Sequence, residues 1–322
     1  MSQINLDLKD RKILYQLDLN ARQPNGQIAK KVGLSKEVVS YRIKRLEKEG
    51  AIENYYTIID MSRLGYFSFR IYIKLSDATP DIEKEIINCL VKDKNSFFVA
   101  EVDGPFDIAI GVWVKDIYEF EDFYLKFKKE YKKNIGKEQI SIFTIAYHFH
   151  RSYILEKKQA ESRVEYFGKS KLEKHDELDI EILRLISQDA RTPIVKMSQQ
   201  LNVPERTIAF RIKQLEKKGV IQGYRALFNL GLLGYEYYKV DMVLRDISRI
   251  RDLISYANTD PNIIYIDQTI GGSDFEFDLE VKNKNHFLEI IGYLRTRFPE
   301  IKEWSYITLR KYDKLIYFPD KE

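Results

Sequence analysis

The chain has 322 residues, and its 53 lysines and arginines against 49 aspartates and glutamates give a formal net charge of +4 at pH 7. This length suits two to four domains, while a charged content of 32% and the lack of any apolar run near ~20 residues argue against a membrane-spanning protein. The lone Cys89 excludes an internal disulfide framework, and the start of the chain lacks the pattern of a signal peptide. We therefore expect a cytoplasmic protein with no membrane partner.

Two stretches of the sequence, 169 residues apart, are similar to each other. Residues 6–66 align without a gap on residues 175–235, with 19 identical residues in 61 positions. Residues 1–60 and residues 171–230 each hold 11 lysines and arginines and 8 aspartates and glutamates, a net charge of +3 (11 − 8). The repeat indicates two copies of one module, and its positive charge has the distribution that nucleic-acid binding requires.

The first repeat predicts three short helices. Asp7 is a suitable N-cap for the first helix, and the second runs between Asn25 and Gly33. Ser35 caps the third helix, which ends at Gly50, and each helix has apolar residues at helical spacing. The tight turn between the second and third helices is typical of a helix-turn-helix.

A wing and a β-rich segment complete each module. The stretch 52–59 predicts a strand pair or wing, and the alternation from Phe69 to Leu75 predicts a half-buried strand. Helical and strand patterns then follow in the order βαββαβ, which is ferredoxin-like, and the second copy repeats this order with a helix from Ile247. The fold class is α+β, with winged helix-turn-helix domains at 1–60 and 175–230, ferredoxin-like domains at 61–155 and 231–322, and a charged linker at 156–174.

Several short motifs carry a resemblance to a known family. They are Asp10-x-x-Ile13-Leu14, Ala21-Arg22, Gly33-Leu34-Ser35, Arg42-Ile43-Lys44-Arg45-Leu46-Glu47, Gly50-x-Ile52, Leu64-Gly65-Tyr66, Gly104-Pro105-Phe106-Asp107 and Gly271-Gly272-Ser273-Asp274. Together with the order of domains, they make the chain similar to the Lrp/AsnC family of transcription regulators. Family members usually carry one copy of the module and assemble as dimers, so the duplication departs from the pattern.

The third helix of each repeat is the candidate DNA-reading helix, because its apolar stripe faces inward and leaves polar side chains outward. The candidate DNA-binding residues are Ser35, Lys36, Ser40, Tyr41, Arg42, Lys44 and Arg45 in the first repeat, and Arg206, Thr207, Phe210, Arg211 and Lys213 in the second. An isolated basic helix would be an ordinary solvated surface, but the repeated three-helix frame favours contact with double-stranded DNA. Tyr41 and Phe210 have two interpretations, contact with a thymine methyl group or packing beside the wing.

The two reading helices begin with different residues. One has Ser35-Lys36-Glu37-Val38 and the other Pro204-Glu205-Arg206-Thr207, so we predict an operator with two unlike half-sites.

The uncovered faces of the two ferredoxin-like sheets differ in charge. One strand of the second copy presents Glu276 and Asp278 in a row of acids, which repel each other unless they are matched. Arg70, Lys74 and nearby Lys115 of the first copy are the expected partners. We therefore predict that the halves pair within one chain as a covalent pseudo-dimer. The alternative is that the acidic face is exposed to solvent. Assembly into a larger homo-oligomer is left open.

The resemblance also implies an effector, because family members often bind an amino acid between their β-rich domains. The candidate effector-binding residues are Gly104, Asp107, Gly271 and Asp274. Free turn amides suit a carboxylate, and an aspartate suits an ammonium group. A tight hairpin that needs glycine and aspartate for its own geometry is the alternative.

Two other functions remain as alternatives, a siroheme-decarboxylase-like enzyme with the same two-part architecture and an architectural DNA binder without an effector. The sequence lacks the pocket motifs of siroheme decarboxylases, a phosphate loop and a nucleophile elbow. His148 and His150 share a strand face that suits metal ligation, but two histidines alone are more often surface or core residues. We therefore predict a regulator that is not an enzyme and has no cofactor or metal.

Overall fold

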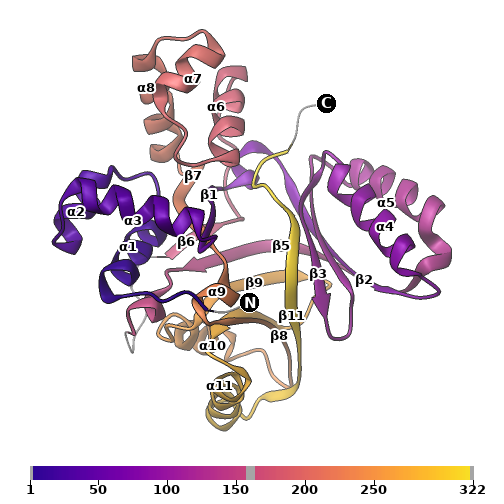
Figure 1. Cartoon of the computed structure of the whole chain (residues 1–322). Coiled ribbons are helices and arrows are strands. Elements are labelled where there is room, and N and C mark those ends of the chain that lie inside the picture. Colours follow the sequence, from indigo (N-terminus) through magenta and orange to yellow (C-terminus); the bar gives the residue numbers. More distant parts are fainter. Residues whose placement is uncertain (1–2, 157–163, 320–322) are drawn as a thin grey trace.

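The computed structural model describes residues 3–156 and 164–319, and in it two helical heads stand beside a ring of strands (Figure 1). The first head comprises α1 (Leu8–Leu19), α2 (Asn25–Val32) and α3 (Lys36–Lys48), and the second comprises α6 (Glu177–Gln188), α7 (Ile194–Leu201) and α8 (Glu205–Lys217). Asp7 and Asp176 begin α1 and α6 with the same capping box. Gly33 and Asn202 end α2 and α7 in the left-handed conformation that the turn requires.

The wings of the two heads form a single ribbon. β1 (Ile52–Ile59) pairs antiparallel with β7 (Ile221–Phe228), and the two make a separate two-stranded sheet. The predicted strand pair within residues 52–59 is therefore wrong, because the partner strand comes from the other repeat. An apolar pattern shows that a strand is buried and leaves the location of its partner open.

Backbone hydrogen bonds fix the heads against each other in matched pairs. The Ala21 amide donates to the Tyr224 carbonyl at 2.8 Å, and the Ala190 amide donates to the Tyr55 carbonyl at 2.9 Å. Each wing strand thus lies against the first helix of the opposite head, and both heads share one apolar core. This exchange of an element between two copies produces a joint that neither copy makes alone.

Each head is followed by a βαββαβ unit, as the sequence predicts. The first unit comprises β2 (Phe67–Leu75), α4 (Pro80–Lys92), β3 (Ser96–Asp103), β4 (Ile108–Val114), α5 (Ile117–Tyr131) and β5 (Ile135–Phe149). The second comprises β8 (Glu236–Leu244), α10 (Ile250–Ala257), β9 (Ile263–Ile270), β10 (Phe275–Val281), α11 (Lys284–Arg297) and β11 (Ile301–Leu315). Short turns connect these elements at η1 (Met61–Leu64), η2 (Lys132–Asn134), η3 (Ser152–Leu155) and α9 (Leu230–Leu233). α10 begins at Ile250 and not at the predicted Ile247.

Eight strands of the described residues close into a ring in the order β2–β4–β3–β11–β8–β10–β9–β5, with β5 pairing again with β2. The two 15-residue strands join the units. β11 pairs with β8 through residues 301–308 and with β3 through residues 308–315, and β5 pairs first with β2 and then with β9. β6 (Val164–Phe167) adds to β5, so the predicted linker contributes a strand to the sheet, and linker residues 157–163 lie outside the described part.

The ring has an apolar outer face, which helices cover. α4 and α5 pack on the first unit around Ile71 and Ile110, and α10 and α11 pack on the second around Val240 and Phe277 (Figure 1). Side chains alternate along a strand, so the remaining residues of the same strands point into the ring. No helix within 3–156 or 164–319 has the length and apolar character needed to cross a bilayer.

The inner face of the ring carries buried charges among apolar and aromatic side chains. Arg70 of β2 and Glu276 of β10 form a buried ion pair across the two units, as the sequence predicts. Lys74 and Lys115 stay within the first unit, since Lys74 pairs with Asp107 at 2.7 Å and Lys115 lies over the Tyr66 ring. These two cations were therefore wrongly predicted to match the acidic strand, because both lie near the end of a strand and outside the ring's interior.

Gly104 provides a direct test of the ring's close packing. Its φ is +131°, and a Cβ there would lie 2.9 Å from the Tyr306 carbonyl oxygen on β11. We expect Gly104→Ala to lower the free energy of unfolding by about 1–3 kcal/mol, because the left-handed backbone and the clash both oppose a side chain. Urea denaturation measures the change.

Gly292 on α11 is the matched control, because its added Cβ would meet nothing within 4 Å. Gly292→Ala should leave stability unchanged or raise it by up to ~1 kcal/mol through helix propensity. A Gly104→Ala variant as stable as the wild type would contradict the close approach of this turn to β11.

Candidate nucleic-acid interface and coupling network

Both reading helices expose a cation and an aromatic ring at equivalent positions. α3 exposes Lys36, Tyr41 and Lys44, and α8 exposes Arg206, Phe210 and Lys213. Tyr41 is 68% exposed and Phe210 is 58% exposed, so neither ring packs beside the wing. The structure thus brings these six of the twelve predicted DNA-binding residues onto open surfaces of the two heads.

Two predicted residues have partners within their own head. The Ser35 hydroxyl caps α3 by accepting from the Val38 amide at 3.3 Å, and the Ser40 hydroxyl accepts from the Asn25 side-chain amide at 2.9 Å. These two side chains therefore hold the helix-turn-helix geometry. Thr207 is half-buried on α8, and a DNA contact by any of the three stays a prediction.

Arg42 and Arg45, which the sequence makes candidates for contact with the DNA backbone, are already paired with carboxylates. Arg42 contacts Asp7 and Asp10 at 2.8 Å, and Arg45 contacts Asp10 at 2.6 Å. Hydrogen bonds to Asp7 and Asp10 raise the pKa of Arg42, and they fasten the reading helix to the first helix of its head.

Arg211 repeats this arrangement in the second head. It contacts Asp176 at 2.8 Å and Asp179 at 3.3 Å. A phosphate contact by these arginines remains a prediction, since it requires them to share or leave these carboxylates.

The four predicted effector-binding residues form turns that dock on the opposite unit. The Asp107 carboxylate accepts from the Leu75 amide at 2.7 Å, and the Asp274 carboxylate accepts from the Leu244 amide at 2.8 Å. Added Cβ atoms at Gly104 and Gly271 would meet backbone oxygens of β11 and β5, respectively. The glycines and aspartates thus have structural roles in the two hairpins, and an effector at these turns stays a prediction.

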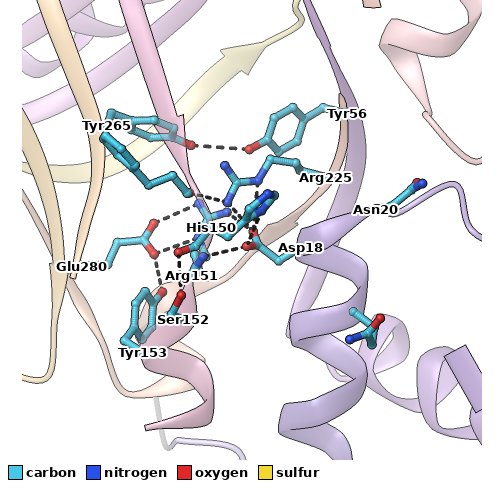
Figure 2. Close-up of polar contacts among 12 residues, drawn as sticks. Asp18, Asn20, Tyr56, His150, Arg151, Ser152, Tyr153, Arg225, Tyr265 and Glu280 are labelled. Atoms are coloured by element: carbon cyan, nitrogen blue, oxygen red, sulfur yellow. Dashed lines mark hydrogen bonds and ion pairs between the residues drawn. The ribbon is translucent and has the colours of Figure 1, made fainter. Parts of the chain in front are cut away.

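A buried polar network, the coupling network, joins both heads to the ring (Figure 2). Asp18 on α1 is completely buried and accepts from Arg225 on β7 at 2.7 Å and from the Arg151 guanidinium at 2.8 Å. Arg151 follows β5 and also donates to both oxygens of Glu280 on β10, at 2.8 and 3.0 Å. The Tyr153 hydroxyl donates to the same carboxylate. One carboxylate of the first head therefore binds cations from the other head's wing and from the ring.

The charges of the coupling network balance, with Asp18 and Glu280 opposite Arg151 and Arg225. Burial alone would raise the pKa of Asp18, but attraction to Arg225, a hydrogen bond with His150 and attraction to Arg151 hold that pKa well below its usual value. Burial of paired charges is costly unless each has several partners, and here each carboxylate has at least two.

Asp18, Arg151 and Arg225 were not among the site residues predicted from the sequence. Two signals were available, an aspartate beside the buried stripe of the first helix and an arginine inside the apolar strand that ends at Phe228. Charged residues at positions that a pattern buries indicate a partner, although the pattern leaves that partner unnamed.

Comparison with known proteins agrees with the two helix-turn-helix repeats. A family model described as winged helix-turn-helix DNA-binding matches residues 6–53 and again residues 175–222. A protein of Pyrococcus furiosus named as an HTH-type transcriptional regulator is 32% identical over 134 residues, which are 41% of this chain and 86% of the relative. A second regulator of that organism is 35% identical over 138 residues, or 39% of this chain and 82% of the relative.

The chain belongs to the family of HTH-type transcriptional regulators that these relatives represent, and its motifs resemble those of the Lrp/AsnC members. Each relative matches about two fifths of the chain, and the helix-turn-helix model matches it twice, so this regulator is a tandem duplication of the module. HTH regulators bind double-stranded DNA, which is the partner expected from the exposed faces of α3 and α8.

The siroheme decarboxylase NirDL has a similar arrangement of both modules. Its crystal structure superposes with a TM-score of 0.63 at 13% identity, covering 98% of this chain and 94% of that chain. A complex of NirDL with an iron-uroporphyrin III analogue gives 0.61 at 14% identity, covering 97% of this chain and 94% of that chain. At this identity the likeness shows the fold alone.

The coupling network predicts a large effect of Asp18→Asn on stability. The substitution leaves two buried guanidiniums short of a carboxylate, so we expect the free energy of unfolding to fall by about 3–5 kcal/mol in urea denaturation at pH 7. Asp122→Asn on the exposed face of α5 is the control and should change it by less than ~0.5 kcal/mol. Equal stabilities of the two variants would contradict the role of Asp18.

The pH dependence of this effect has a definite sign. The folded-state pKa of Asp18 is lowered, so its contribution is present above an unfolded pKa of about 3.9 and is lost as pH falls through the folded value. The difference between wild type and Asp18→Asn should therefore shrink in acid.

Proposed function

We propose that the chain binds one operator in double-stranded DNA as a covalent pseudo-dimer, with α3 and α8 as its two reading helices. The observation that supports this proposal most is the joint between the heads. The Arg22 guanidinium donates to the Ala190 and Thr192 carbonyls at 2.6 and 3.0 Å, and the Arg191 guanidinium donates to the Asn25 side chain at 2.6 Å. Two reading helices at one fixed spacing suit two half-sites on one duplex.

The charge on the reading helices supports a salt-dependent interaction. Lys36, Lys44 and Lys213 are exposed, and a lysine that neutralises a phosphate releases condensed counterions. The exposed Tyr41 and Phe210 rings suit apolar contact with thymine methyl groups, which carries sequence information. Lysines would set affinity, and the rings would contribute to sequence preference.

The two half-sites of the operator should differ, because the two heads present different side chains. The first turn of α3 has Lys36 and Glu37, whereas the first turn of α8 has Glu205 and Arg206. Residues near the start of a reading helix contact base edges in helix-turn-helix proteins. A duplicated chain is free to diverge in this way, and a homodimer of one module is not.

An amino-acid effector is part of the proposal through the family resemblance. Asp107 and Asp274 each bind a backbone amide, so an ammonium group would use their remaining acceptor capacity. Equilibrium dialysis against the twenty amino acids tests this element, and Asp274→Asn should weaken any binding found at that turn. Absence of binding by all twenty would remove the effector and leave DNA recognition intact.

An enzymatic function similar to that of NirDL is the second candidate, and the likeness over both modules favours it. Charge is the argument against it, since iron-uroporphyrin analogues carry several carboxylates and the ring's interior holds Asp267, Glu276 and Asp278 close together. Absorbance spectroscopy of the protein with iron-uroporphyrin III tests it, and a saturable shift in the tetrapyrrole band would support this alternative.

Lysine variants provide the test of the DNA-binding proposal. Lys36→Ala and Lys44→Ala should each weaken binding to every duplex to a similar extent and reduce the slope of log affinity against log salt by about 1. Fluorescence anisotropy titrations at several salt concentrations measure both quantities.

Lys129→Ala, on the exposed face of α5 away from the heads, is the matched control and should bind DNA as the wild type does. Equal losses in Lys129→Ala and Lys36→Ala would show that general positive charge, and not the reading helix, determines binding.

A further inference from the structure

A small cavity lies inside the ring, between the two βαββαβ units. Its volume is about 120 Å³, and residues of both units line it, including Arg70 and Phe98 of the first and Lys239 and Asp278 of the second. An engineered cavity of about 150 Å³ binds benzene, so a molecule of that size or slightly smaller fits here.

Aromatic rings form much of the wall of this cavity. They belong to Tyr72, Phe97, Phe98, Phe143, Tyr237, Tyr265, Tyr312 and Tyr317. Arg70 already lies over Tyr72 at 4.8 Å and over Phe143 at 5.1 Å. The other ring faces suit a planar group or a second cation, because the face of an aromatic ring attracts positive charge.

The buried charges around the cavity do not balance. Arg70 and Lys239 are the cations of this cluster in the described residues, and its carboxylates are Asp241, Asp267, Glu276 and Asp278, a formal net charge of −2 (2 − 4). Burial holds the pKa of His148 well below its usual value, so this ring adds no charge at neutral pH. The coupling network, in contrast, balances two carboxylates with two guanidiniums.

Two polar groups in the cavity wall lack a hydrogen-bond partner among the described residues. They are the Ser68 hydroxyl and Nε of Arg70, whose side chains are 6% and 2% exposed. The other two nitrogens of the Arg70 guanidinium bind Asp267 and Glu276. Buried polar groups are rarely left unsatisfied, so a further molecule is expected beside each: the Ser68 hydroxyl can accept from an ammonium group, and Nε of Arg70 is a donor that a water or another acceptor would satisfy.

We propose that this cavity binds a small organic cation, a primary ammonium or an amidinium on a compact planar or apolar group. The positive group would lie against Asp267 and Asp278, which both line the cavity and belong to the acidic excess. The apolar part would pack on the remaining aromatic rings, and Ser68 would bind a polar substituent. This inference is independent of the DNA-binding proposal.

The protonation of Asp278 agrees with a missing positive charge. Burial raises its pKa to about 6 despite attraction to Lys239, with repulsion from Asp267 adding to the shift. The Tyr237 hydroxyl donates to Asp278 at 2.5 Å, and Lys239 donates at 3.2 Å. A bound cation would favour the ionised carboxylate and displace its proton.

A larger cleft lies beside the cavity. Its volume is about 820 Å³, and it shares seven lining residues with the cavity, namely Tyr237, Tyr265, Thr308, Leu309, Tyr312, Leu315 and Tyr317. Arg151 and Glu280 of the coupling network also line this cleft. The cavity is therefore close to the residues that connect the ring to the heads.

Matched small probes test the charge that the cavity selects. Isothermal titration calorimetry of the full chain without DNA at pH 7.5 compares isobutylamine, isobutanol and isobutyrate, which are no larger than benzene, are similar in size and carry positive, zero and negative charge. We expect isobutylamine to bind at least tenfold more tightly than isobutanol and isobutyrate not to bind. Equal binding of the alcohol, preference for isobutyrate, or no binding of any probe would each overturn the proposal.

Asp278→Asn separates a ligand site from a structural role. The variant should lose isobutylamine affinity at least tenfold, while its melting temperature at pH 7.5 should equal or exceed that of the wild type, because it relieves an unbalanced charge. Asp313→Asn in the cleft, outside the cavity, should keep the wild-type affinity. Equal affinities of Asp278→Asn and wild type would overturn the proposal. The proposal would also be overturned if potassium or magnesium chloride stabilised the protein and abolished amine binding, because an inorganic cation would then occupy the site.

Discussion

The structure depends on the charged faces of two sheets, each of which has helices on its other face only. These charged faces are buried against each other. Each βαββαβ unit has an apolar face under two helices and a second face with Arg70 or with Glu276 and Asp278. In an isolated unit Arg70 or Glu276 would lack its partner across the ring, and the closed ring pairs them while β5 and β11 pair with strands of both units. The duplication makes this closure intramolecular, which removes the concentration dependence that an association of separate chains would have.

The same closure places the heads. β5 leads directly to Arg151, which contacts Glu280 in the ring and Asp18 in the first head, and Asp18 also binds Arg225 of the second head's wing (Figure 2). A change at the ring's interior thus has a physical route to both reading helices. A route of this kind is a chain of contacts, and energetic coupling along it would need two arrangements with different ligand affinities.

The parts of the fold that depend on local sequence were predictable. Capping residues such as Asp7 and left-handed positions such as Gly33 define the head helices, and alternating side chains define the strands. The pairing of β1 with β7 was not predictable, because strands with similar apolar patterns do not specify their partners. The repeat also predicted that α3 and α8 expose polar and aromatic side chains, and their contact with DNA stays a prediction. The coupling network was not predictable, because Asp18 and Arg225 meet only after the heads have interlocked.

The stoichiometry of the DNA complex tests the central claim most directly. Sedimentation equilibrium of the chain with a selected operator, together with hydroxyl-radical footprinting of both strands, counts the chains and maps the contacts. The account predicts one chain per operator and two protected half-sites of different sequence, separated by a whole number of helical turns. Two chains on a palindrome, with one head of each in contact, would contradict it.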